Sequence, residues 1–136
     1  MLAPRTWWRW LVAQFYYLLG AAHRHFGNLY VLRSEYDSAI RAFSQAIDTN
    51  PNFARAYLER GILYWRETEQ PRLAIEDLTT AYRLDAGLSE ARFNRGVAHQ
   101  QLREYEEALA DFRAYLAEGQ HPYWREHAEK MIQELE

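Results

Sequence analysis

Histidine and glutamate pairs are the residues of this chain that could do chemistry, and their spacing argues against a reactive site. His23 and His25 lie two positions apart, so a helix would turn them to different faces, where they could not chelate a metal as an i, i+4 pair does. Glu106 and Glu107 are adjacent, which is typical of a solvated helix face. The chain has no cysteine, so disulfides, thiolate ligands and a cysteine nucleophile are excluded.

Known catalytic motifs are absent from the sequence as well. It contains no His-Glu-x-x-His, no glycine-rich phosphate loop and no Gly-x-Ser-x-Gly elbow. We therefore predict no catalytic residue, no metal and no cofactor, and a chain that is not an enzyme.

Charge is distributed unevenly along the 136 residues, which fit one domain. Residues 1–33 contain Arg5, Arg9, Arg24 and Arg33 and no acidic residue, whereas the remainder holds 12 basic and 19 acidic residues. An acidic remainder repels phosphate, so we expect no nucleic-acid partner. The two ends of the chain face different electrostatic surroundings.

Small residues recur with a period close to 34. Gly27, Gly61 and Gly96 are 34 and 35 residues apart. Alanines follow each glycine at similar distances; the residues predicted to pack within the repeats are Gly27, Ala39, Ala46, Gly61, Ala74, Ala81, Gly96 and Ala108. Small residues let two antiparallel helices approach closely, so we expect Gly27 to face Ala39 and Ala46. A glycine inside a helix costs about 1 kcal/mol relative to alanine, which indicates a packing requirement.

The pattern predicts helices and no strand. We expect seven, at about 6–33, 36–48, 53–67, 71–84, 88–102, 105–118 and 122–135. Asn50-Pro51-Asn52 breaks the chain between the first two units, and Gly87 and Gly119 suit helix C-terminal caps.

This arrangement resembles the tetratricopeptide repeat family, whose period is 34 residues. The first unit matches best, through Gly27, Tyr30, Tyr36, Ala39-Ile40, Phe43, Ala46 and Pro51. The resemblance implies an all-α solenoid of about three repeats at residues 20–53, 54–88 and 89–121. Residues 1–19 would form an apolar helical extension, and residues 122–136 a capping helix.

In that family the first helices of the repeats line a groove that holds a peptide or a partner's helix. Carried onto this sequence, the groove residues are Arg24, Asn28, Arg55, Leu58, Glu59, Ile62, Trp65, Arg66, Phe93, Asn94 and Val97, with His25, Glu90 and Gln101 beside them. The apolar members either contact the partner or pack against neighbouring repeats.

One subclass of the family clamps the carboxylates of chaperone tails with Lys, Arg and Asn side chains. Arg24 and Asn28 match that clamp, but Glu59 and Glu90 stand where it needs Asn and a cation. Their carboxylates would repel the ligand, so a chaperone tail is disfavoured.

The N-terminal stretch is apolar on nearly all sides of a helix. The residues predicted to contact a membrane or partner are Trp7, Trp8, Arg9, Trp10, Leu11, Phe15, Tyr16, Leu18 and Leu19. Residues 7–22 would reach only about 24 Å as a helix, and Arg9 interrupts them, which argues against an ordinary spanning segment. Three alternatives remain: a helix that folds onto the first repeat, one that lies in a membrane surface, and one docked on an integral membrane protein.

Together these features predict a protein–protein interaction scaffold that is peripherally associated with a membrane through residues 1–22. Its role would be that of an accessory subunit or assembly factor of a membrane-associated complex. The alternative is a soluble, cytoplasmic peptide-binding adaptor whose N-terminal helix only caps the solenoid.

Overall fold

A computed structural model describes residues 6–136, and within that range the chain is all-α. The seven helices are α1 (Trp7–Tyr30), α2 (Arg33–Thr49), α3 (Ala54–Arg66), α4 (Pro71–Leu84), α5 (Ser89–Gln101), α6 (Tyr105–Glu118) and α7 (Pro122–Leu135). The helices predicted from the sequence are confirmed, with ends within three residues. The boundary predicted at residue 19 falls inside α1, and residues 1–5 of the predicted extension lie outside the described range.

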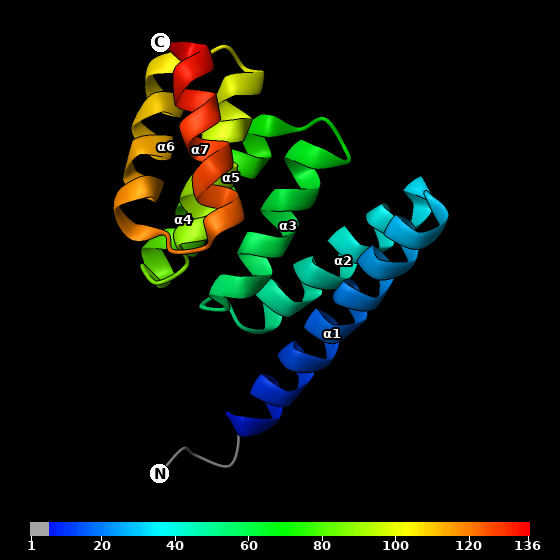
Figure 1. Cartoon of the computed structure of the whole chain (residues 1–136). Helices are drawn as coiled ribbons and strands as arrows, with labels where there is room; N and C mark the ends of the chain where they lie inside the picture. Colours follow the sequence, from blue (N-terminus) through cyan, green and yellow to red (C-terminus); the bar gives the residue numbers. More distant parts are fainter. Residues whose placement is uncertain (1–5) are drawn as a thin grey trace.

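The helices form antiparallel hairpins that stack in chain order (Figure 1). α1 pairs with α2, α3 with α4 and α5 with α6, while α7 packs on α6. The turn between α1 and α2 projects away from α4–α7 in Figure 1, so the first hairpin extends beyond the stack. The architecture is an α-solenoid.

Glycines lie where the two helices of each hairpin cross. A Cβ on Gly61 would come within 2.9 Å of Leu78, and a Cβ on Gly96 within 2.8 Å of Phe112. Both glycines thus make room for the large apolar residue of the partner helix, as overpacking there would force the helices apart.

The first hairpin uses a different glycine from the one predicted. The residue that approaches Phe43, the counterpart of Leu78 and Phe112, is Gly20, at 2.8 Å from a Cβ built on it. Gly27 instead lies against the ring of Tyr36, two turns further along α1. The prediction that Gly27 faces Ala39 and Ala46 is therefore wrong. The glycine at this helix crossing is Gly20, seven residues earlier in the chain. Matching glycines by spacing missed this because seven residues restore the same helix face.

The shift gives the first hairpin a longer reach than the other two. α1 continues ten residues past Gly20, whereas α3 and α5 end five residues past Gly61 and Gly96. It ends at Tyr30 and is capped by Val31, which adopts a left-handed conformation with φ of 54°. That conformation is rare for a β-branched residue, so the exposed end of this hairpin is strained.

The second and third hairpins each contain a buried ion pair between their two helices. Arg60 donates two hydrogen bonds to Asp77, at 2.7 and 2.8 Å, and Arg95 donates two to Asp111, at 2.8 and 2.6 Å. Each arginine also bonds a hydroxyl of the preceding hairpin, on Ser44 and Thr79 respectively. Bidentate geometry of this kind fixes orientation as well as adding energy, so these pairs set how neighbouring hairpins stack.

The C-terminal caps predicted for two helices, Gly87 and Gly119, are only partly found. Gly119 is the C-cap of α6, in extended conformation. The C-cap of α4 is instead Asp85, whose side chain accepts a hydrogen bond from the backbone N–H of Gly87, so Gly87 lies in the following turn and is not the cap. The left-handed positions belong to Val31, Glu69 and Arg103 rather than to glycines.

Candidate partner-binding surfaces

The apolar strip predicted for the groove is largely part of the core. Leu58 is fully buried, and Phe93 and Asn94 are buried at 6% and 8% exposure. Phe93 packs against the rings of Phe112, Tyr115 and Trp124. The assignment of Leu58, Phe93 and Asn94 to a ligand-contacting surface is therefore wrong, because these positions fill the space between successive hairpins.

The other apolar groove residues are half-buried against the same core. Ile62 and Trp65 pack beside Leu58, and Val97 packs beside Phe93. The indole N–H of Trp65 donates to the side-chain oxygen of Asn94 at 3.2 Å. These side chains stabilise the stack first and offer only part of their surface to a ligand.

A cluster of charged side chains lies where the groove was predicted. Arg24 forms an ion pair with Glu59, and Tyr17, Arg55 and Glu90 lie within electrostatic range of that carboxylate. We call Tyr17, Arg24, Arg55, Glu59 and Glu90 the groove charge cluster. Burial raises the pKa of the Glu59 carboxyl, Arg24 opposes the rise, and Glu90 adds to it by repulsion.

Tyr17 was absent from the predicted groove. It belongs to α1, packs on Phe43 and Phe53, and has a pKa raised by burial and by the nearby Glu59 carboxylate. Its place follows from the shift in the first hairpin: three residues before Gly20, it matches Leu58 and Phe93, three residues before Gly61 and Gly96. Only the correct glycine register would have revealed it.

The cluster continues into a surface cavity of about 220 Å³ between the starts of α3, α5 and α7. Its lining includes Arg55, Glu90, His121 and Trp124. Charged and aromatic side chains thus converge from three helices that are distant in sequence, as a site for an extended segment requires.

The remaining groove candidates lie apart from the cluster. Asn28 is exposed and accepts a hydrogen bond from the Tyr36 hydroxyl at 3.0 Å, on the far part of the first hairpin. Arg66 is exposed at the end of α3 and lies 3.2 Å from Glu67. The structure therefore brings Arg24, Arg55 and Glu59 together and leaves Asn28 and Arg66 outside.

The N-terminal contact residues divide between two faces of α1. Ala13, Gly20 and Gly27 are buried against α2, and Tyr16 packs partly on the core beside Ile47 and Ala56. The other face is open to solvent: the exposed large apolar residues of α1 and its turn are Trp7, Trp8, Trp10, Leu11, Phe15, Leu18, Leu19, Phe26, Leu29, Tyr30, Val31 and Leu32. We call this set the α1 apolar face.

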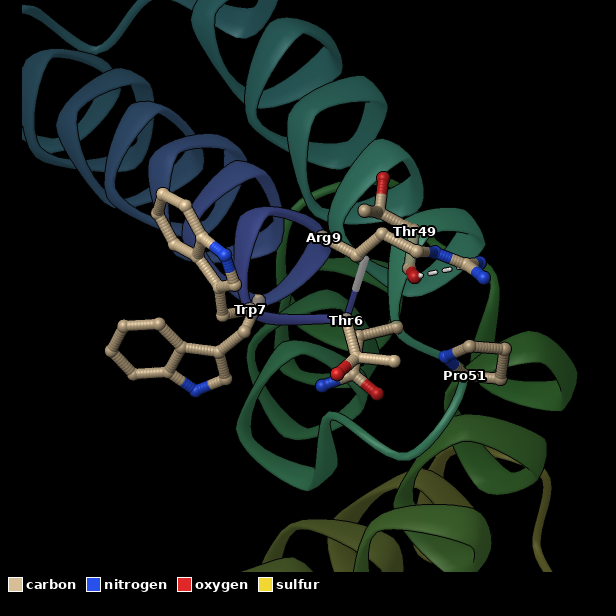
Figure 2. A pocket seen from close by; sticks show the side chains of 7 residues that line it. Thr6, Trp7, Arg9, Thr49 and Pro51 are labelled. Atoms are coloured by element: carbon tan, nitrogen blue, oxygen red, sulfur yellow. Dashed lines mark hydrogen bonds between the residues drawn. The ribbon is translucent and has the colours of Figure 1, made fainter. Parts of the chain in front are cut away.

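Arg9 ties the start of α1 to the end of α2. Its guanidinium donates to the carbonyl of Thr49 at 3.2 Å, as Figure 2 shows. A cation at the C-terminal end of a helix is favourable because the last carbonyls carry partial negative charge. Trp7 and Pro51 lie close by in Figure 2, and with Trp10 they line an open cavity of about 460 Å³.

Residues 6–136 contain neither a metal-binding cluster nor a membrane-spanning helix. No group of three or more His, Cys, Asp or Glu side chains in that range could hold a metal ion. None of the helices described there combines the length and the apolar character needed to cross a bilayer.

Family models agree with this geometry. A model described as TPR repeat matches residues 27–67, and a model described as tetratricopeptide repeat matches residues 66–122. The chain belongs to the tetratricopeptide repeat family. The family resemblance predicted from the sequence is thereby confirmed.

Curated relatives match part of the tetratricopeptide repeat chain. Human serine/threonine-protein phosphatase 5 is 34% identical over 85 residues, which are 62% of this chain and 17% of the phosphatase. The Hsp70-Hsp90 organizing protein of Triticum aestivum is 29% identical over 98 residues, 72% of this chain and 17% of the relative. The chain thus spans about a sixth of the length of these relatives.

Solved tetratricopeptide repeat domains share the fold. The Arabidopsis OM64 TPR domain has a TM-score of 0.81 at 25% identity and covers 93% of this chain and 98% of its own. The first TPR of Spaghetti (RPAP3), bound to the HSP90 peptide SRMEEVD, has a TM-score of 0.69 at 24% identity and covers 88% and 94%. The peptide bound to the RPAP3 domain and the organizing-protein relatives support a protein–protein interaction scaffold.

Proposed function

We propose that this chain is a peptide-binding adaptor that holds an extended segment of a partner protein across the groove charge cluster. The observation that carries the proposal is the convergence of Arg24, Arg55, Glu59 and Glu90 from α1, α3 and α5 at one surface. Hsp70-Hsp90 organizing proteins among the relatives and peptide complexes among the structural neighbours favour the same role. This is the adaptor that the sequence offered as the alternative.

The charges of the cluster favour a ligand with a basic residue. Arg24 is already paired with Glu59, and within residues 6–136 the Glu90 carboxylate has no ion-pair partner. An acidic tail would bring further carboxylates beside Glu59 and Glu90, and like charges at short range repel. A lysine or arginine of the ligand would instead relieve the repulsion between Glu59 and Glu90.

The test compares two labelled synthetic peptides, SRMEEVD and SRMKKVK, by fluorescence anisotropy. We expect the lysine peptide to bind about fivefold more tightly, the effect of one ion pair of about 1 kcal/mol. Glu59→Asn combined with Glu90→Lys should reverse the preference. Glu106→Asn combined with Glu107→Lys, an equal change of charge at exposed positions on α6, should leave it unchanged. Binding of neither peptide, or a wild-type preference for the acidic one, would contradict the proposal.

A second candidate role is that of an accessory subunit or assembly factor of a membrane-associated complex. The α1 apolar face supports it, because exposed apolar patches beyond a few hundred Å² on a monomer usually mark an interaction surface. Deleting residues 1–20 would be a poor test, since it removes Ala13 and Gly20 from the contact with α2. Replacing exposed side chains is the better one: Leu11→Ser, Phe15→Ser and Leu18→Ser together should abolish co-fractionation with membranes and capture of a membrane partner in mild detergent.

A further inference from the structure

The α1 apolar face runs the full length of its helix. Trp8, Leu11, Phe15 and Leu18 follow one another at three- and four-residue steps, and Ala22, Phe26 and Leu29 continue the same line. Phe15 and Leu18 are 61% and 64% exposed. At 1.5 Å per residue the 24-residue helix is about 36 Å long. The stripe is therefore a straight apolar edge, not a local patch.

The opposite side of α1 is attached to α2 from one end to the other. Gly27 lies against Tyr36, Gly20 against Phe43, and Arg9 is bonded to Thr49. Because α2 covers that side, a surface that meets the stripe can contact only one face of α1. The helix would have to lie flat against it.

Charge along the stripe indicates the kind of surface. The part of α1 and its turn within residues 6–33 contains Arg9, Arg24 and Arg33 and no acidic residue. Arg33 is exposed at one end of the stripe, whereas Arg9 bonds the Thr49 carbonyl on the α2 side and Arg24 is paired with Glu59 in the groove. An apolar face with Trp and Tyr, an arginine at one end and no carboxylate on its helix suits the headgroup region of an anionic bilayer.

We propose that α1 is an in-plane anchor whose apolar face lies in the surface of an anionic bilayer along its whole length. The indoles of Trp7 and Trp8 and the phenol of Tyr30 lie at headgroup level, and Arg33 meets the lipid phosphates. This inference rests on the second candidate role above, and it assigns the contact to lipid rather than to a membrane protein.

The first experiment is co-flotation of the full chain with phosphatidylcholine vesicles, with and without phosphatidylserine. We expect binding to the anionic vesicles and at least tenfold weaker binding in the triple variant Leu11→Ser, Phe15→Ser, Leu18→Ser. The matched control is Leu73→Ser, Leu84→Ser and Tyr105→Ser, exposed apolar residues on α4 and α6, which should bind as the wild type does. Circular dichroism shows whether each variant is folded, and Arg33→Gln alone should weaken binding about fivefold.

The second experiment tests whether the helix lies flat. The chain has no cysteine, so Trp8→Cys, Phe15→Cys, Leu29→Cys and Leu84→Cys each give a single site for a polarity-sensitive fluorophore. The probes at 8, 15 and 29 should all shift to shorter wavelength on adding anionic vesicles, and the probe at 84 should not. A shift at one end of α1 alone would overturn the in-plane arrangement.

Two outcomes separate this inference from the role on which it rests. If the chain ignores anionic vesicles but the α1 triple variant still loses an integral membrane partner, the lipid contact is refuted and the membrane-complex role stands. If the face instead drives a concentration-dependent dimer that the triple variant abolishes, with no vesicle binding, the anchor proposal is also overturned.

Discussion

The first hairpin differs from the second and third hairpins in the residues that lie where its two helices cross. In the second and third hairpins an arginine directly before the crossing glycine pairs with an aspartate three residues after the partner helix's alanine, as in Arg95–Asp111. At the corresponding positions the first hairpin has Leu19 before Gly20 and Ala42 after Ala39. It has exchanged the buried ion pair for apolar side chains.

That difference separates two functions along the solenoid. The hairpins with ion pairs are fixed to their neighbours and carry most of the groove charge cluster. The first hairpin contributes Tyr17 and Arg24 to that cluster and turns its other face, which is apolar and without carboxylates on α1, outward. The opposite end of the stack looks different again: beyond Pro122 and Tyr123 at its start, the exposed residues of α7 are polar, namely Glu126, Glu129, Lys130, Gln133 and Glu134, as expected of a terminal cap.

Removing one ion pair should have the largest effect. Asp111→Ala leaves the Arg95 guanidinium without its bidentate partner, and breaking a buried pair costs about 3 kcal/mol. Leu19→Ala, at the matching place in the first hairpin, should cost less than about 1 kcal/mol because Leu19 is exposed. Urea denaturation followed by circular dichroism measures both free energies of unfolding. Equal losses of stability would contradict the difference between the first and third hairpins.

Enlarging the glycines should show which glycine of α1 lies at the helix crossing. Gly20→Leu and Gly61→Leu should each destabilise the fold by about 2 kcal/mol, since a side chain there meets Phe43 or Leu78. Gly27→Leu should cost less, because Tyr36 lies near the open end of the hairpin and can turn outward. Thermal unfolding that ranks Gly27 above Gly20 would restore the register predicted from spacing.

Relieving the strained turn should stabilise the first hairpin. Val31→Gly removes the penalty of a β-branched residue in the left-handed region and should gain about 1 kcal/mol. Arg103→Gly, at the left-handed position of the third hairpin with φ of 61°, should gain less because arginine is not β-branched. The midpoint of urea unfolding decides between them.

The smallest effect concerns pH. Burial raises the pKa of Glu59 in the folded chain, so the folded state binds its proton more tightly than the unfolded state. Stability should therefore decline as pH rises from the unfolded pKa, about 4.3, through the folded value. The difference in unfolding free energy between wild type and Glu59→Gln, measured across that range, should show the decline; a difference that grows with pH in favour of wild type would contradict it.

The period of about 34 residues and the positions of proline and glycine were sufficient to predict the helices, because each hairpin repeats the same small and large residues. The register of α1 against α2 could not be predicted, since Gly20 and Gly27 lie on one helix face and only packing against Phe43 distinguishes them. The ion pairs do leave a signal in the sequence, since the dipeptides Arg60-Gly61 and Arg95-Gly96 repeat in register. Burial of Leu58 and Phe93 depends on the adjoining hairpin, which no local pattern reveals.

The central claim is that the groove charge cluster and the α1 apolar face are separate binding surfaces. The most direct measurement is the affinity of the triple variant Leu11→Ser, Phe15→Ser, Leu18→Ser for the SRMKKVK peptide, made on the protein that fails to float with anionic vesicles. We predict a peptide affinity within about twofold of wild type, because those side chains are exposed on α1 and none belongs to the groove charge cluster. Loss of both activities in a variant with wild-type helicity would show that the two surfaces are one.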